Sequence, residues 1–453
     1  MRVDIEALFS TLPAGVAVTD PDIVASYARD QSTFTDSSQP LAMLAPTSTD
    51  EVSQCLAWAH QHCIPVVARG AGTGLSGGAN ATPGSVVLSL HRMTSLLAID
   101  PVERLAVVQP GMIVGDLRAE VARLGLHYPP DPGSVEMSSI GGNVATNAGG
   151  MCCVKYGTTG DFVESLQIVL ADGRVMRTGS RTVKGVAGYE LTSLFVGSEG
   201  TLGVITEITV RLLPAPRLPH TLVASFSSLA DAGEAVAGLR REGVSLSMLE
   251  ILDRTTISAV NDMLRMGLDD VDALLLMQSD ARTPSADLDT AEEVCGAAID
   301  LVRSEDPAES GLLLAARRQA LPALERLGDC LLDDVCVPIA RITELIETVA
   351  GIADRTGLRI GVFGHAGDGN LHPTVIFDRA DPASHAAAVQ AFDEITGAAL
   401  RLGGTITGEH GVGLLKQGWL RRELDPVNIQ VQRAVKLALD PHGILNPGKA
   451  IGS

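Results

Sequence analysis

The chain has few basic residues for its length. Of its 453 residues, 34 are Lys or Arg and 54 are Asp or Glu, which gives a formal net charge of -20. Proteins that bind nucleic acid or an anionic membrane surface present a cluster of basic side chains. The composition therefore argues against both classes, we expect no nucleic-acid partner, and an anionic substrate would need cations placed locally in its site.

The sequence also lacks closely spaced cysteine pairs. Its seven cysteines are an odd number and no Cys-x-x-Cys occurs, which argues against a disulfide framework and against a self-contained iron–sulfur cluster. Residues 1–6 show no apolar signal-peptide core, and no apolar run approaches membrane-spanning length. We therefore expect a soluble cytoplasmic protein in a reducing compartment.

A chain of this length predicts two or three domains. Pro214, Pro216 and Pro219 mark a boundary, after which short strand and helix patterns alternate, with a long helical pattern at 286–303. This order predicts an α+β domain with helices on one face of an antiparallel sheet. We predict domains at 1–215, 216–405 and 406–453.

A glycine-rich segment, Arg69–Gly78, follows a predicted strand at 64–68. It contains a formal GxGxxG match at Gly72–Gly77, but the dinucleotide-binding fingerprint requires a helix to begin there, and a second turn at 79–84 follows instead. No Lys-Ser/Thr follows the glycines, so the segment is not an ATP-type P-loop either. Its backbone N–H groups could still form a nest for a pyrophosphate; the alternative is a flexible surface loop.

Two further segments are rich in small residues. Ser139–Gly150 is low in charge and crowded with Gly, Ala and Asn, and Gly197–Gly203 leads into an alternating strand pattern at 204–212. Such sequence suits backbone that lies against a flat ligand.

Histidines gather in two glycine-framed segments near the C-terminus, Gly364–Thr374 and Gly408–Gly413. Asp368-Gly369 is a hairpin-turn dipeptide, and with these two residues at the centre of the turn His365 pairs with His372. Their Cβ atoms would then lie about 4.5–5.5 Å apart, close enough to share one divalent metal ion.

Glu409 could supply a third metal ligand and leave one coordination position open, as in catalytic rather than structural sites. His410 would then lie within reach of whatever the metal holds. The alternative is that these histidines cap turns or satisfy buried backbone groups. The residues alone leave both interpretations open.

Taken together, these segments resemble the FAD-binding 2-hydroxy-acid dehydrogenases of the vanillyl-alcohol-oxidase type, and are most similar to glycolate oxidase flavin subunits and to D-lactate and D-2-hydroxyglutarate dehydrogenases. The resemblance spans essentially the whole chain. It implies an α+β fold with a two-lobed PCMH-type FAD-binding domain, a ferredoxin-like substrate (cap) domain and a small C-terminal helical segment that returns to the FAD domain. The segments that carry it are 69–79, 139–150, 197–207, 364–372, 408–413 and 446–449.

The resemblance also implies how FAD is held. Relatives that bond the flavin covalently through the first glycine-rich loop carry a histidine where this chain has Thr73, so FAD is expected to bind without a covalent link. The implied cofactor contacts are Arg69, Gly70, Ala71, Gly72, Thr73, Gly74, Pro132, Gly133, Ser134, Gly141, Gly142, Asn143, Thr146, Glu199, Gly200, Val204, Ile205 and Asn446.

By the same resemblance His365, His372 and Glu409 bind a divalent metal, expected to be zinc, and His410 is the catalytic base. Arg317 is implied to pair with the substrate carboxylate, for which a planar guanidinium is well suited. The alternative for Arg317 is a solvated helix cation.

Two positions bear on the substrate. Where the hydroxyglutarate branch has a lysine, an ungapped alignment puts Leu332, and where it has an asparagine this chain has Thr374. Both differences favour a small or apolar-tailed acid such as glycolate or lactate. The electron acceptor stays open among oxygen, a quinone, a cytochrome and an iron–sulfur subunit, and a homodimer is expected.

Three other functions remain as alternatives. A nicotinamide-dependent dehydrogenase would use the Gly72–Gly77 match. A flavin-binding electron-transfer or assembly subunit would have no substrate of its own. A flavin-free metal hydrolase would leave the glycine-rich first domain unexplained.

Overall fold

The computed structural model describes residues 9–268 and 271–451. Residues 1–6, on which the absence of a signal peptide was judged, lie outside the described residues. The chain forms two compact units. The first contains residues 9–149, 158–215 and 409–451, and the second contains residues 150–157 and 216–408.

The first sheet of the first unit has the strand order β1-β2-β4-β3, in which β2, β4 and β3 are parallel. Helix α3 (Thr49–His62) lies between β2 and β3 in the sequence, and Ser48 caps it by accepting a hydrogen bond from the Glu51 N–H at 3.2 Å. The strands are β1 (Ala17–Val18), β2 (Met43–Leu44), β3 (Val66–Arg69) and β4 (Val86–Ser89).

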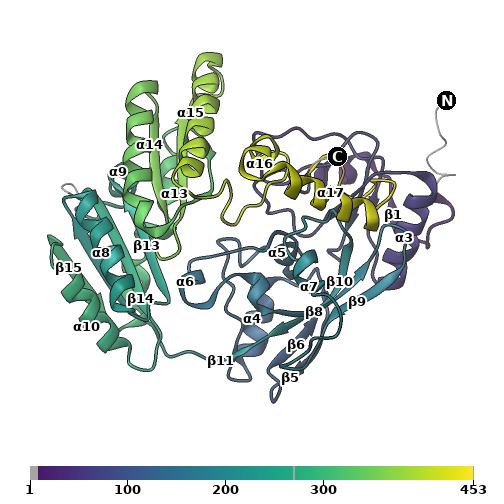
Figure 1. Cartoon of the computed structure of the whole chain (residues 1–453), viewed down its shortest axis with the longest axis horizontal. Coiled ribbons are helices and arrows are strands. Elements are labelled where there is room, and N and C mark those ends of the chain that lie inside the picture. The colour runs from purple at the N-terminus through teal and green to yellow at the C-terminus, as the bar shows by residue number, and fades with distance from the viewer. Residues whose placement is uncertain (1–8, 269–270, 452–453) are drawn as a thin grey trace. The chain divides into compact units, whose positions relative to one another are not determined.

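The second sheet of the first unit is antiparallel, with the order β5-β6-β10-β8-β9. Figure 1 shows it as a layer of its own within this unit. Its strands are β5 (Leu96–Asp100), β6 (Leu105–Val108), β8 (Val163–Val169), β9 (Val175–Gly179) and β10 (Val204–Arg211).

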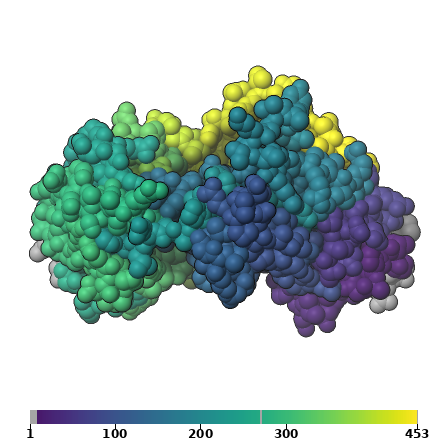
Figure 2. Space-filling model, turned by 90° about the horizontal axis from the view of Figure 1, so that it is seen from below, coloured from purple at the N-terminus to yellow at the C-terminus, as the bar shows by residue number. Residues whose placement is uncertain are grey.

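The C-terminal segment joins the first sheet. Val66 of β3 donates its N–H to the Ile444 carbonyl at 2.8 Å, and the Asn446 N–H donates to the Val66 carbonyl at 2.8 Å. Ile444 and Leu445 are buried in the same apolar core as α3. The preceding helices α16 (Gln417–Glu423) and α17 (Pro426–Leu439) have no buried residues and appear in yellow at the surface in Figure 2. The predicted return of the C-terminus to the FAD domain thus has a structural counterpart.

The second unit is built on one sheet with the order β15-β12-β14-β13-β18-β19-β16, and β17 pairs with β19. Every pair in it is antiparallel. The strands are β12 (His220–Phe226), β13 (Met248–Asp253), β14 (Ala273–Ser279), β15 (Asp300–Ser304), β16 (Asp329–Leu332), β17 (Val335–Cys336), β18 (Arg359–His365) and β19 (Asn370–Phe377).

Helices cover both faces of this sheet. All residues of β13 and β19 are buried, which requires a covering layer on each side because successive side chains point to opposite faces. Helices α9 and α13 pack on one face, and α8, α10, α14 and α15 belong to the other layer (Figure 1). The α+β fold class is confirmed, but the prediction that helices cover only one face of the sheet was wrong. Their bounds are α8 (Leu229–Glu242), α9 (Arg254–Leu264), α10 (Pro284–Val294), α13 (Ala320–Glu325), α14 (Ile342–Thr356) and α15 (Pro382–Arg401).

The long helix predicted at 286–303 ends early. Helix α10 stops at Val294, and β15 begins at Asp300 and pairs with β12. The helical pattern continued in sequence, but pairing with an open sheet edge determines the structure of residues 300–304.

None of the helices in the described part of the chain is long and apolar enough to cross a membrane. All seven cysteines fall within the described residues, and all are free thiols.

Candidate active site

The predicted histidine hairpin is present, but its register differs from the prediction. His365 lies opposite Asn370 and His372 lies opposite Phe363. The turn is longer than two residues: the Gly369 N–H donates to the His365 carbonyl at 2.9 Å, so Ala366–Gly369 form the connection. Asp368 and Gly369 thus occupy its end, with Gly369 at φ +86°, rather than its centre.

The two histidines nevertheless meet. The observed register differs from the predicted one by two residues, so both side chains stay on the same face of the sheet. A difference of one residue would have placed them on opposite faces. Their Nε2 atoms lie 3.4 Å apart, and the rings are edge to face with centroids 5.2 Å apart. Both side chains are almost completely buried. The predicted closeness of the two imidazoles is therefore present in the second unit.

Glu250 links one of these histidines to Arg317, and nothing in our sequence analysis had singled it out. Its Oε1 lies 2.7 Å from His365 Nδ1, and its Oε2 forms an ion pair with Arg317 Nε. The side chain is fully buried. Burial alone would raise the pKa of Glu250, but His365 and Arg317 hold that pKa below its ordinary value. The available signal was a single acid in the middle of the apolar strand Met248–Asp253.

Arg317 is not a solvated surface cation. Its side chain is 13% exposed, it pairs with Glu250, and its guanidinium carbon lies 5.0 Å from the centre of the Phe363 ring. Phe363 is the residue opposite His372 in the hairpin. The structure therefore brings Arg317 into the same cluster as the two predicted metal ligands.

A second buried carboxylate, Asp334, organises the other side of the hairpin. It accepts hydrogen bonds from Asn370 Nδ2 at 2.7 Å, from Thr407 Oγ1 at 2.7 Å and from the Gly408 N–H at 3.0 Å. Its Oδ1 also lies 3.9 Å from His372 Nδ1. Asp334 thereby ties the strand end that carries His372 to the chain that leads directly into Glu409.

Glu409 and His410 are the first residues of the C-terminal part of the first unit. The Ser76 hydroxyl donates to the His410 carbonyl at 3.0 Å. Glu199 accepts from the Val412 and Gly413 N–H groups, both at 2.8 Å. The segment that carries His410 is therefore held by two of the segments predicted to contact FAD.

Glu199 uses both carboxylate oxygens for those bonds. Burial raises the pKa of Glu199, in opposition to the two backbone N–H groups that lower it. Its backbone has φ +51°, and its carbonyl accepts from Asn446 Nδ2 at 2.6 Å. A direct contact of the Glu199 carboxylate with FAD stays a prediction.

Two glycine-rich segments lie against one another in the first unit. A Cβ on Gly70 would collide with the Ser139 hydroxyl and would also meet Gly142, and a Cβ on Gly72, at φ +78°, would collide with the Arg69 guanidinium. No helix follows these glycines, since β4 is the next regular element, so the nicotinamide-binding interpretation has no structural support.

This arrangement fits FAD. Among residues 9–268 and 271–451, no acceptor is found for the N–H groups of residues 71–74, so these groups are available to a pyrophosphate. The amide nitrogen of Asn143, a predicted FAD contact, is buried and likewise has no partner in the described structure. A bound cofactor would supply the missing acceptors.

The remaining predicted cofactor residues also lie in the first unit. Arg69 is almost buried, donates to the Arg29 carbonyl at 2.8 Å and has a pKa lowered by burial. Gly200 approaches the Ala68 side chain. The others are Ala71, Thr73, Gly74, Pro132, Gly133, Ser134, Gly141, Thr146, Val204 and Ile205, and their contacts with FAD stay predictions.

Lys449 closes the C-terminus over the first glycine-rich loop. Its ammonium donates to the Asn80 carbonyl and, at 2.7 Å, to Asn446 Oδ1, while Asn446 Nδ2 donates to the Gly78 carbonyl at 3.0 Å. Burial lowers the pKa of Lys449 to about 7, although Asp30 and Glu199 act in the opposite direction. The terminal segment is therefore part of the structure that shapes this loop.

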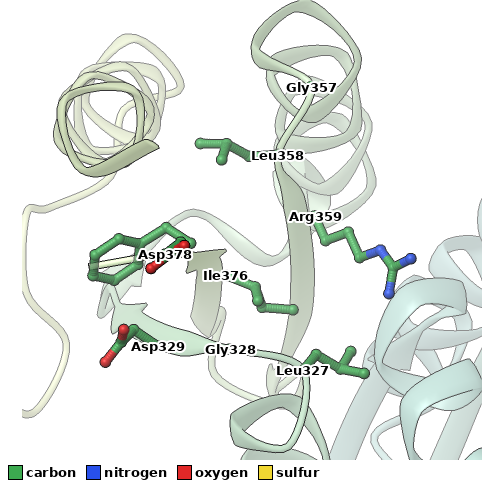
Figure 3. A pocket seen from close by; sticks show the side chains of 9 residues that line it. Leu327, Gly328, Asp329, Gly357, Leu358, Arg359, Ile376 and Asp378 are labelled. Atoms are coloured by element: carbon green, nitrogen blue, oxygen red, sulfur yellow. The ribbon is translucent and has the colours of Figure 1, made fainter. Parts of the chain in front are cut away.

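The second unit also has a surface hollow of about 440 Å³. Figure 3 shows Asp329, Asp378 and Arg359 around it, with Ile376 between them. The hollow lies at the start of β18 and the end of β19, whereas His365 and His372 lie at the opposite ends of these strands. None of the predicted site residues lines it.

Two family models match the chain. One, described as "FAD linked oxidases, C-terminal domain", matches residues 215–450, and the other, "FAD binding domain", matches residues 40–179. The fold and the glycine-rich cradle thus define a flavin-binding oxidoreductase. The chain belongs to the FAD-linked oxidases, and the predicted dependence on FAD is confirmed at this level.

Several characterised and solved proteins are similar to the chain. Glycolate oxidase subunit GlcD of Bacillus subtilis (strain 168) is 42% identical over 91% of this chain and 89% of its own length. D-lactate dehydrogenase of Anaerostipes hadrus is 34% identical over 98% and 96%. The structure of p-cresol methylhydroxylase with substrate bound has a TM-score of 0.80 at 18% identity, and the match covers 99% of this chain and 96% of that chain. That structure shows the fold alone, and the predicted PCMH-type architecture is confirmed.

Proposed function

We propose that the chain oxidises a small 2-hydroxy acid, of the glycolate or D-lactate type, to the corresponding 2-oxo acid. The observation that supports this most directly is the buried cluster of His365, His372 and Arg317. It combines two imidazole nitrogens 3.4 Å apart with a guanidinium bound to the same carboxylate as one of them. Relatives in the FAD-linked oxidases are named as glycolate oxidase subunits and D-lactate dehydrogenases.

The two histidines, together with Glu409, would hold a divalent ion, with zinc as the expected metal. Two nitrogens bound to one tetrahedral zinc at about 2.0–2.1 Å lie about 3.3 Å apart, and the observed Nε2 separation is 3.4 Å. Glu409 follows Gly408, whose N–H is fixed by Asp334. Such an ion would lower the pKa of a substrate hydroxyl and fix its orientation.

Arg317 would grip the substrate carboxylate. Its Nε is committed to Glu250, which leaves the two terminal nitrogens for the paired hydrogen bonds that a carboxylate accepts. His410 would accept the proton of the hydroxyl group, since a neutral imidazole can do so near neutral pH. FAD, when bound, takes the α-hydrogen as hydride, so the acid loses two electrons and two hydrogens in all.

The substrate tail would be short or apolar. Leu332 and Thr374 lie directly opposite one another on β16 and β19, so they share one face of the sheet. That face also carries His372, two residues from Thr374. Leu332 packs against the apolar core that contains Phe363. An apolar side chain here offers no cation to a second carboxylate.

Anaerobic bleaching of the flavin tests this function. The purified chain is mixed with glycolate, D-lactate, L-lactate and D-2-hydroxyglutarate in turn, and the visible flavin absorbance is followed. We expect glycolate or D-lactate to bleach it and D-2-hydroxyglutarate to do so far more slowly. A flavin that stays oxidised with every acid would reject the proposal and favour an electron-transfer subunit without a substrate of its own.

A further inference from the structure

Glu250 does more than form one ion pair, because it lies between the His365 imidazole and the Arg317 guanidinium. It lies opposite His365 where β13 pairs with β18, so both side chains project from the same face of the sheet. Each carboxylate oxygen has its own partner, His365 Nδ1 for one and Arg317 Nε for the other. The side chain has 0% exposure, so the carboxylate has no contact with solvent.

The first contact decides which nitrogen of His365 is available. An ionised carboxylate can only accept hydrogen bonds, so His365 Nδ1 carries the proton and donates it to Glu250. The other ring nitrogen, Nε2, then presents its lone pair, and this is the atom that lies 3.4 Å from His372 Nε2. A carboxylate behind a ligating imidazole also raises the basicity of the ligand.

The second contact decides how Arg317 lies. Binding through Nε holds the guanidinium by one edge, and the guanidinium carbon lies over the Phe363 ring. The two terminal nitrogens are left as a fork of fixed direction. One carboxylate therefore holds both the His365 ring and the Arg317 guanidinium.

We propose that Glu250 is a positioning residue that couples metal binding at His365 to carboxylate binding at Arg317. The proposal rests on the proposed function, because it assigns to one residue the alignment of the two groups on which that function depends. Both carboxylate oxygens of Glu250 are already engaged by His365 and Arg317. Its negative charge would also reduce the repulsion between the guanidinium and a divalent ion held at His365.

A purely structural role for Glu250 makes a different prediction. A buried ion pair that only stabilises the fold affects the free energy of unfolding when it is broken, without a selective effect on metal or substrate. The coupling role predicts that loss of the charge weakens two distinct binding events in a chain that is still folded. The two roles are separated by binding measurements rather than by stability alone.

The test uses Glu250→Gln in the FAD-loaded chain, with Asp253→Asn as the matched control. Asp253 lies on the same strand, is also buried, and caps α9 through the Thr256 N–H at 2.8 Å, a role that Asn fills equally well. Zinc affinity is measured by titration of the metal-free, flavin-loaded chain. Michaelis constants and turnover are measured with the acid that bleaches the wild-type flavin.

We expect Glu250→Gln to weaken zinc binding about 10- to 100-fold, the usual cost of removing the partner of a ligating histidine. We also expect KM for the acid to rise about tenfold or more even at saturating zinc, with flavin content unchanged. Asp253→Asn should match wild type in both measurements. Unchanged zinc affinity or unchanged KM in a folded Glu250→Gln chain would overturn the coupling.

Should Glu250→Gln fail to fold, the wild-type chain supplies the decisive measurement. Nitrogen-15 NMR of labelled histidines is expected to show His365 protonated at Nδ1, and protonation at Nε2 instead would overturn the proposal. A wild-type chain that neither binds zinc nor is bleached by any hydroxy acid would reject the proposed function, and the coupling with it. If the wild-type chain binds zinc and is bleached by a hydroxy acid, while Glu250→Gln has unchanged zinc affinity and KM, the coupling is rejected but the proposed function stands.

Discussion

The Nε2 atoms of His365 and His372 lie 3.4 Å apart although neither histidine is the other's partner across the hairpin. The closeness comes from the shared sheet face and from Glu250 and Asp334, which lie near Nδ1 of the respective rings. Two imidazoles in such a position are suited to bind one ion.

Gly72 is predicted to strengthen FAD binding because its backbone conformation and close contacts leave no room for a side chain. At φ +78° a Cβ is strained by about 1–2 kcal/mol, and at this position it would also collide with the Arg69 guanidinium. We expect Gly72→Ala to weaken FAD affinity about tenfold or more, measured by flavin fluorescence during titration of the apoprotein. Gly84→Ala is the control, because Gly84 has φ +73° with nothing within 4 Å of the added Cβ. Equal FAD affinity in the two variants would show that the loop does not hold the cofactor.

Glu199 is predicted to keep the His410 segment in place. Its carboxylate accepts from the Val412 and Gly413 N–H groups, and one buried bond of this kind contributes about 1.5–3 kcal/mol. Glu199→Gln should therefore lower turnover about tenfold or more while the chain retains its flavin. Glu207→Gln, which breaks the surface ion pair with Arg177, should leave turnover unchanged. A Glu199→Gln chain with wild-type turnover would show that these bonds do not matter for catalysis.

Leu332 and Thr374 are predicted to select against dicarboxylates. The double variant Leu332→Lys with Thr374→Asn adds a cation and an amide on the face that carries His372. We expect kcat/KM for D-2-hydroxyglutarate to rise at least about tenfold, which corresponds to about 1.4 kcal/mol. Leu327→Lys, at a more exposed position before β16, should leave the preference unchanged. No gain in the double variant would place the substrate tail elsewhere.

Asp253 is predicted to make stability depend on pH. Burial raises the pKa of Asp253 from 3.8 to about 6. The folded chain therefore binds more protons than the unfolded chain between these values, and this residue's contribution to stability falls as pH rises through that window. Asp253→Asn should remove this dependence. Relative to wild type, the free energy of unfolding of the variant should increase by at most about 3 kcal/mol between pH 4 and pH 6. Chemical denaturation at both pH values measures the difference, and parallel profiles for the two chains would contradict it.

The sequence predicted the hairpin but not its register. Asp368-Gly369 correctly indicated a turn. The predicted register was wrong by two residues, and because a shift by an even number keeps side chains on the same face, His365 and His372 still share one face of the sheet. The register was missed because the turn closes through a hydrogen bond from the Gly369 N–H to the His365 carbonyl, and this closure depends on the neighbouring strands. Val335 and Cys336 pair with Leu371 and Asn370 and extend the sheet there.

The supporting carboxylates could not be located from local patterns. Glu250 precedes His365 by 115 residues and Asp334 precedes Gly408 by 74, so only the sheet order brings them together. An acid inside an otherwise apolar strand was a usable signal for Glu250, since a fully buried carboxylate requires partners. Likewise, no local pattern indicated that residues 150–157 belong to the second unit.

If oxidation at the His365–His372 pair is metal-assisted, the rate of anaerobic flavin reduction depends on the bound metal. The acid that bleaches the flavin is mixed rapidly with the chain before and after treatment with EDTA. His372→Gln is measured beside wild type, and His385→Gln, at a histidine outside the predicted site whose ring contacts Phe377, serves as the control. We predict that EDTA slows reduction about a hundredfold or more, that zinc or manganese restores it, and that His372→Gln stays slow in every case. Equal rates of flavin reduction with and without metal, and in His372→Gln, would show that oxidation does not depend on a metal bound at the His365–His372 pair.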